Sequence, residues 1–70
     1  MTRRNFSDLS PAETRVLALL ATGLSNRAMA ARLGVSQHTI RSHVAHVYAI
    51  LDLHNRSDAT REALRLGITT

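Results

Sequence analysis

The sequence contains no cysteine and no long apolar run, and both absences exclude classes of protein. Without cysteine it has no disulfide framework and no thiolate metal ligands, which suits a reducing cytosol. Its longest apolar run, residues 16–21, is far too short to span a membrane, and no apolar signal-peptide core follows residues 1–4. We therefore expect a cytoplasmic domain without cofactor, redox chemistry or membrane contact.

Acidic residues are absent from the whole stretch between Glu13 and Asp52. That stretch contains Arg15, Arg27, Arg32, Arg41 and three histidines. All nine basic residues of the chain are arginine, and the net charge is +4 at pH 7. Because the planar guanidinium presents a fixed fork of N–H donors that matches phosphate oxygens and guanine edges, this charge pattern favours nucleic acid as the partner.

Helix signals recur along all 70 residues, whereas strict alternation of apolar and polar residues is absent. Ser10, Pro11 and Glu13 form a capping-box start for a helix that reaches about Thr22, and Gly23 follows it. This small size gives a thin core and a narrow stability margin.

Three further helices are predicted by the same kind of punctuation. Ser25 or Asn26 caps a second helix ending at residue 33, and a third runs from after Ser36 to about residue 51. Asn55 or Ser57 caps a fourth. We therefore predict an all-α four-helix bundle in which residues 23–44 form a helix-turn-helix.

The third predicted helix has two distinct faces. Ile40, Val44, Val47 and Leu51 recur at helical spacing and face the core. The opposite face consists of His38, Ser42, Ala45 and Ala49, flanked by Arg41 and His46. This outer face is the surface that a major groove would meet.

The order of these motifs resembles the LuxR-type, also called GerE-type, helix-turn-helix domain of bacterial transcription regulators. The resemblance rests on residues 9–13, 16–17, 23–27, 30, 33, 36, 39–44, 51, 55–56 and 59. It implies a domain over residues 9–70 that binds double-stranded DNA, with the third helix in the major groove and the fourth able to pair two copies. Residues 1–8 are expected to form a flexible tail, in which Arg3 and Arg4 suggest a minor-groove arm as a less favoured alternative.

The resemblance places three residues at the bases, namely Arg41, Ser42 and Ala45. It places Asn26, Arg27, Ser36 and Thr39 near phosphates, where helix N-termini add free N–H groups. From their positions on the helices we add His38 to the base contacts and Arg32, Gln37 and His46 to the phosphate contacts. Leu64, with Thr60 and Gly67 beside it, is the predicted dimer face on the fourth helix.

Four residues depart from the family pattern. Ala45 stands where a hydrogen-bonding or basic side chain is common, so base readout is expected to depend on few contacts. Ala28 replaces a frequent glutamate, and Ile50 replaces a frequent lysine that would add charge near DNA. Asp52 replaces the usual glycine after the third helix, where aspartate tolerates the left-handed conformation at some cost.

No catalytic or metal site is predicted. Ser42 and His43 are helix neighbours that point about 100° apart, without a third orienting group. His43 and His46 lie one turn apart, but neither a cysteine nor a carboxylate is near them in the sequence to complete a metal site. We expect His43 to pack beside the core with a hydrogen bond, and no small molecule to bind this domain.

Two alternatives to a LuxR-type regulator stay open at this point. The first half of the chain also resembles region 4 of sigma factors, which would add RNA polymerase as a partner. A protein-interaction module that kept the fold but lost DNA binding is favoured by Ala45 and Ile50.

Overall fold

Four helices make up the regular structure of residues 8–68, the part of the chain that the computed structural model describes. Their bounds are Pro11–Ala21 (α1), Asn26–Leu33 (α2), Gln37–Leu51 (α3) and Arg56–Arg65 (α4). These residues contain no strand, which confirms the all-α prediction. Most of the predicted tail, including Arg3 and Arg4, lies outside the described residues. None of the four helices has the length and apolar character needed to cross a bilayer.

Each helix begins at a side chain that accepts a hydrogen bond from the backbone N–H three residues later. The four capping residues are Ser10, Ser25, Ser36 and Asn55. At α1 the predicted capping box is complete, because Glu13 Oε1 also accepts the Ser10 N–H at 3.0 Å. The helix starts are therefore fixed by short-range contacts that the sequence reveals.

α2 and α3 end at residues in the left-handed conformation. Gly34 follows α2 with φ +69°, and Asp52 follows α3 with φ +56°. Asp52 is the one non-glycine residue with positive φ in the described part of the chain. Asp52 therefore adopts the left-handed conformation expected of the glycine that is usual in the family at this position.

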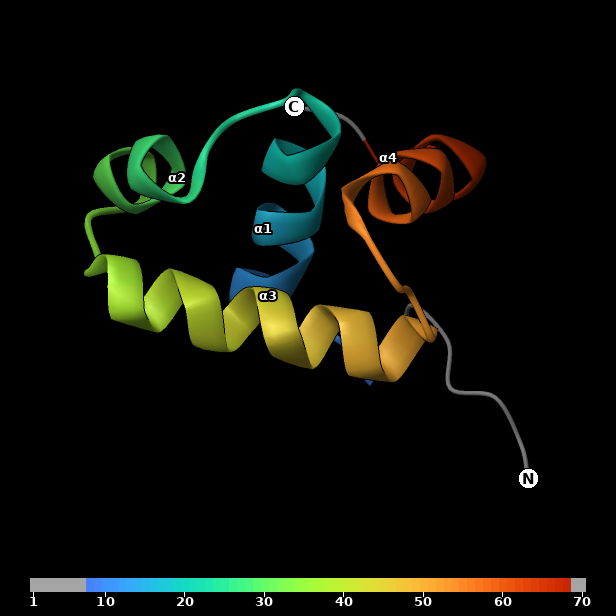
Figure 1. The fold of residues 1–70 in the computed structure, drawn as a ribbon, viewed down its shortest axis with the longest axis horizontal. Coiled ribbons are helices and arrows are strands. Elements are labelled where there is room, and N and C mark those ends of the chain that lie inside the picture. Colours follow the sequence, from blue (N-terminus) through green and yellow to red (C-terminus); the bar gives the residue numbers. More distant parts are fainter. Residues whose placement is uncertain (1–7, 69–70) are drawn as a thin grey trace.

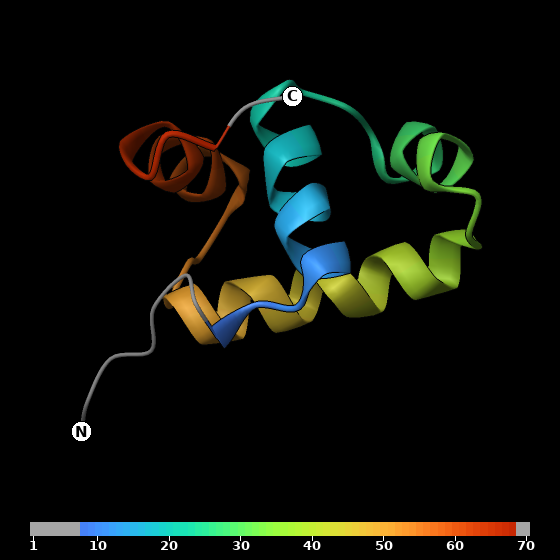
Figure 2. The ribbon, with the colours of Figure 1, turned by 180° about the vertical axis from the view of Figure 1, so that it is seen from behind.

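The arrangement is that of a helix-turn-helix with two further helices packed behind it. In Figure 1, α3 runs along one edge of the molecule, α1 rises from its middle, and α2 and α4 lie on either side of α1. The reverse view in Figure 2 shows α1 in front of the same arrangement. α1 packs against α3 and α4, and α2 packs against α3.

The core lies where these helices meet and contains the predicted apolar stripes. Its fully buried large side chains are Val16, Leu17, Leu20, Met29, Ile40, Val47 and Leu51. Ala59 and Ala63 are also fully buried and allow α4 to approach closely. Ile50, which stands where the family often has lysine, is 5% exposed and belongs to the core. The face of α3 that packs against the core therefore includes Ile50 in addition to the predicted Ile40, Val44, Val47 and Leu51.

We predict that Asp52→Gly raises the free energy of unfolding by about 0.5–1 kcal/mol, because glycine adopts positive φ without the Cβ penalty. The matched control is Gly34→Ala, where an added Cβ meets no atom within 4 Å and only backbone strain acts. That control is expected to lower stability by about 1 kcal/mol. Urea unfolding of the three proteins measures both changes, and an unchanged or lowered stability of Asp52→Gly would contradict the prediction.

Candidate nucleic-acid interface

The outer face of α3 is exposed as predicted. His38, Arg41, Ser42, Ala45 and Ala49 are all exposed, whereas the opposite side of the helix is buried against α1 and α2. This face therefore points away from the body of the domain. An α-helix that is exposed along one side and lies at the edge of a small domain can enter a major groove, which is about 12 Å wide.

The N-termini of α2 and α3 share one local structure. Ser25 and Ser36 each cap the third N–H group of their helix at 3.1 Å. The preceding N–H groups, those of Asn26 and Arg27 in α2 and of Gln37 and His38 in α3, have no acceptor within their helices. Such N–H groups bind anionic oxygens.

Thr39 takes part in the turn between α2 and α3. Its side chain is half-buried, and its hydroxyl oxygen accepts a hydrogen bond from Ser36 Oγ at 3.0 Å. The two hydroxyl groups therefore stabilise the turn between α2 and α3. Phosphate contacts by Ser36 and Thr39 stay predictions, as do all the predicted DNA contacts.

The arginines of α4 differ from those of α2 and α3 in their partners. Arg61 pairs with Asp58 at 2.5 Å and Arg65 with Glu62 at 2.5 Å, both within α4. The backbone N–H of His54 and then the Arg61 guanidinium outweigh burial and lower the pKa of the Asp58 carboxyl. The positive charges of Arg61 and Arg65 are therefore compensated within α4.

No such compensation occurs in the helix-turn-helix. Arg27, Arg32 and Arg41 are exposed and form no ion pair with any residue in the 8–68 range. α2 and α3 contain no carboxylate. Of the five described arginines without an ion pair, three lie on the two helices predicted to contact DNA, and the other two are Arg15 on α1 and Arg56 on α4.

Glu13 precedes the acid-free stretch in the sequence but contacts it in the structure, which the sequence did not show. It is 6% exposed and is the one buried charged side chain among residues 8–68. Its Oε2 lies in hydrogen-bond contact with Nδ1 of His46 and 3.9 Å from Nδ1 of His43. The carboxylate of α1 therefore contacts the flank of α3, even though 33 residues separate Glu13 from His46.

The electrostatics of Glu13 follow from these contacts. Burial alone would raise the pKa of its carboxyl, but the Ser10 backbone N–H and the His46 ring outweigh burial and lower the pKa below its ordinary value. Glu13 is therefore an ionised, hydrogen-bonded group between α1 and α3. His46 is half-exposed, and with Nδ1 directed to Glu13 only its Nε2 is available for the predicted phosphate contact.

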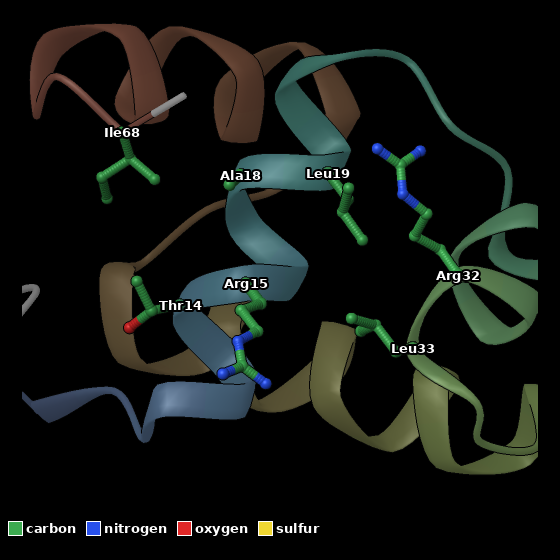
Figure 3. Close-up of a pocket in the computed structure, with 7 residues that line it drawn as sticks. All are labelled: Thr14, Arg15, Ala18, Leu19, Arg32, Leu33 and Ile68. Atoms are coloured by element: carbon green, nitrogen blue, oxygen red, sulfur yellow. The ribbon is translucent and has the colours of Figure 1, made fainter. Parts of the chain in front are cut away.

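Arg32 lies beside a groove next to α1. Its guanidinium extends over a groove between α1 and α2, and Arg15 of α1 lines the same groove (Figure 3). Phosphate contact by Arg32 stays a prediction.

The predicted dimer face lies on the exposed side of α4. Leu64 is 62% exposed, the largest exposure of any large apolar side chain among the described residues. The Thr60 hydroxyl donates to the Arg56 carbonyl at 3.1 Å, and Gly67 follows the helix with positive φ. An exposed leucine on a short, polar helix provides a site for apolar contact with a second surface.

Arg56 is a residue whose role the sequence did not reveal. Its Nη2 donates a hydrogen bond to the Leu24 carbonyl in the turn between α1 and α2. The signal available beforehand was only its membership in an Asn-Arg pair of the family pattern. Because the contact joins residues 32 positions apart, no local pattern could have predicted it.

The histidines do not form a cluster suited to a metal ion. Within the described residues, no group of three or more His, Cys, Asp or Glu side chains has the arrangement needed to hold one. His43 is half-buried beside the core, as its position on α3 predicted.

Comparison with known proteins gives one consistent family. The model of "Bacterial regulatory proteins, luxR family" (GerE) matches residues 7–63. A Mycobacterium tuberculosis protein described as an HTH-type transcriptional regulator is 44% identical over 64 residues, covering 91% of this chain but 7% of the relative. The transcriptional regulatory protein YdfI of Bacillus subtilis is 37% identical over 68 residues, covering 97% of this chain and 32% of YdfI. The chain thus spans less than a third of these relatives.

Solved structures agree with the sequence matches. The response regulator ChrA of a heme-sensing two-component system superposes with a TM-score of 0.79 and 35% identity, covering 97% of this chain and 32% of ChrA. The transcription factor GerE superposes with a TM-score of 0.76 and 31% identity, covering 89% of this chain and 92% of GerE. The fold is therefore similar to a small regulator and to one part of a larger regulator.

We predict that Glu13→Gln lowers the free energy of unfolding by about 1–2 kcal/mol near neutral pH, because glutamine keeps a polar cap but lacks the ionised acceptor. Since the pKa of Glu13 in the folded state lies below its ordinary value of 4.5, the stabilisation is complete above pH 4.5 and is lost as the pH falls through the lower value. The difference between wild type and variant, measured by urea unfolding, should therefore narrow in acid.

The control for this experiment is Ser10→Ala. It removes the hydroxyl that accepts the Glu13 N–H but no titratable group, and is expected to cost about 1 kcal/mol with a smaller dependence on pH than Glu13→Gln, because the Ser10 hydroxyl is the smallest of the groups that lower the Glu13 pKa. If the Glu13→Gln difference stayed constant into acid, the ionised contact between α1 and α3 would not contribute to stability.

Proposed function

Because the chain belongs to the luxR family of bacterial regulatory proteins, we propose that it binds double-stranded DNA sequence-specifically as the helix-turn-helix domain of a transcription regulator. The family is one of regulators and not a class of enzymes. In this proposal α3 enters the major groove, α2 crosses the DNA backbone, and two copies pair on a two-fold site.

The observation that carries the proposal is the charge of α2 and α3. Arg27 and Arg41 are exposed, have no carboxylate partner among the described residues, and flank the free N–H groups at the helix starts. DNA phosphates supply the negative charge and the acceptor oxygens that these groups lack. Glu13, which contacts the flank of α3, is buried and hydrogen-bonded, so it contributes little repulsion at the surface.

Base readout is proposed to depend mainly on Arg41. Its guanidinium suits the O6 and N7 acceptors of guanine, and Ser42 and His38 add shorter hydrogen-bonding side chains on the same face. Ala45 offers only a methyl group, which suits contact with a thymine methyl. With a single long polar side chain at the bases, affinity for DNA in general is expected to be strong relative to sequence preference.

Phosphate contacts are proposed to orient α3 in the groove. Asn26 and Arg27 at the start of α2 and Gln37 at the start of α3 combine side-chain donors with free backbone N–H groups. His46 contributes through Nε2 while its Nδ1 is held by Glu13. Ser36 and Thr39 support these contacts from the turn.

Pairing of two copies is proposed to use Leu64, with Thr60 and Gly67 beside it. The exposed leucine is the apolar centre of this face, and the ion pairs within α4 leave few uncompensated charges to oppose close approach. RNA polymerase remains a further proposed partner of the regulator.

A protein-interaction module without DNA binding has less support than the sequence gave it. Of the two residues that favoured it, Ile50 is buried in the core and so offers no surface. Ala45 alone favours that alternative, and the uncompensated arginines favour DNA.

We predict that the logarithm of the DNA affinity falls linearly with the logarithm of the salt concentration, with a slope of about −0.9 per phosphate neutralised. Fluorescence anisotropy with a labelled duplex measures this slope. A slope of zero would exclude DNA binding through phosphates and would favour the interaction module.

We predict different effects for two arginine substitutions. The two duplexes are a site selected from genomic fragments and unrelated DNA. Arg41→Ala should reduce the binding free energy by about 1–3 kcal/mol on the selected site and by less on unrelated DNA, because it removes a base contact. Arg27→Ala should weaken binding to both duplexes equally and reduce the salt slope by about one. Equal losses on both duplexes for Arg41→Ala would instead assign Arg41 to the phosphate contacts.

We predict that Leu64→Glu abolishes cooperative binding to a duplex with two half-sites but leaves affinity for one half-site nearly unchanged. The charged side chain would oppose apolar pairing without altering α3, and Leu64 is exposed, so the fold should persist. Gel-shift titration on the two duplexes distinguishes the effects. Cooperative binding by the variant would assign pairing to another surface.

A further inference from the structure

A groove lies between α1 and α2, separate from the outer face of α3. It measures about 490 Å³ and is lined by Thr14, Arg15, Ala18, Leu19, Arg32, Leu33 and Ile68. Figure 3 shows Arg15 and Arg32 on different sides of it, with Leu19 and Leu33 between them and Ile68 at the far end. The groove is lined by residues of α1 and α2 together with Ile68, whereas the exposed outer face of α3 points away from α1.

The groove combines an apolar floor with uncompensated charge. Its floor consists of the nearly buried Ala18 and Leu19 and the half-buried Leu33 and Ile68. None of its lining residues is acidic, and neither Arg15 nor Arg32 pairs with a carboxylate of the described residues. Two guanidinium groups at the rim of an apolar floor attract an anionic group attached to an apolar one.

This chemistry favours a protein segment over DNA. A phosphate backbone would satisfy the arginines but would place ionised oxygens over the apolar floor, which costs free energy without a compensating hydrogen bond. A peptide can satisfy both parts, because a leucine or phenylalanine can fill the floor while neighbouring aspartate or glutamate side chains pair with the arginines.

We propose that the groove between α1 and α2 is a docking surface for a short acidic segment of a partner protein, with one large apolar side chain seated between Arg15 and Arg32. Apart from Arg32, which is also a predicted phosphate contact, the surface is distinct from the residues proposed to contact DNA and does not depend on them. An acidic partner bound there would also partly neutralise the positive charge of α2.

The test begins with peptide selection from a phage-displayed library on the intact domain, followed by counter-selection against Arg15→Glu. The peptides that survive should contain a large apolar residue flanked by Asp or Glu. Their affinity for Arg15→Glu, measured by fluorescence anisotropy, should fall about tenfold or more, because like charges then face each other. Backbone amide shifts in NMR spectra should move at Ala18, Leu33 and Ile68.

The matched control is Arg61→Glu, which changes the net charge equally on α4, outside the groove. It should leave peptide affinity within about twofold, and both variants should weaken non-specific DNA binding equally, through net charge alone. Thermal unfolding by circular dichroism checks that both variants are folded. Addition of saturating duplex should leave the peptide bound.

Three results would overturn the proposal. They are a failure to select acidic peptides sensitive to Arg15→Glu, amide shifts confined to residues outside the groove, and competitive displacement of the peptide by duplex DNA. The last result would assign the groove to DNA. If the wild-type domain did not bind DNA, that result would count against the proposed function but would not affect the peptide result.

Discussion

The Glu13 carboxylate connects the start of α1 to the helix proposed to read DNA. One of its oxygens accepts the Ser10 N–H at the first turn of α1, and the other contacts His46 on α3. Because the group is buried, each contact depends on the other: without both, an ionised carboxylate in this position would be costly. Formation of α1 and attachment of α3 to it are therefore thermodynamically linked, which matters in a domain whose small core gives a narrow stability margin.

The positions of the carboxylates explain where the domain presents positive charge at its surface. Asp58 and Glu62 compensate arginines on α4, and Glu13 is enclosed between α1 and α3, so no carboxylate opposes the arginines of α2. The sequence showed the stretch without acids but not that Glu13 reaches it. Burial and hydrogen bonding of this one carboxylate explain why the stretch still presents positive charge to the outside.

Helix boundaries were predictable because their causes are local. Serine caps, the capping box at Ser10 and the left-handed residue Asp52 all act within four positions, and the structure confirms them. The burial of Ile50 was not expected because a stripe drawn through every third or fourth residue underestimates the width of the face that α3 presents to the core. The contact between Glu13 and His46 and the position of Arg32 over a groove depend on how α1 meets its neighbours, which no local pattern records.

The hydrogen bond from Arg56 to the Leu24 carbonyl has a consequence for any assembly built on α4. It joins the first turn of α4 to the segment that leads into α2, and so restrains movement of these two helices relative to each other. If two copies pair through α4, the separation and relative rotation of their two α3 helices are then fixed by the fold of each copy. The number of base pairs between half-sites would then be determined by the structure of the single domain before it binds DNA.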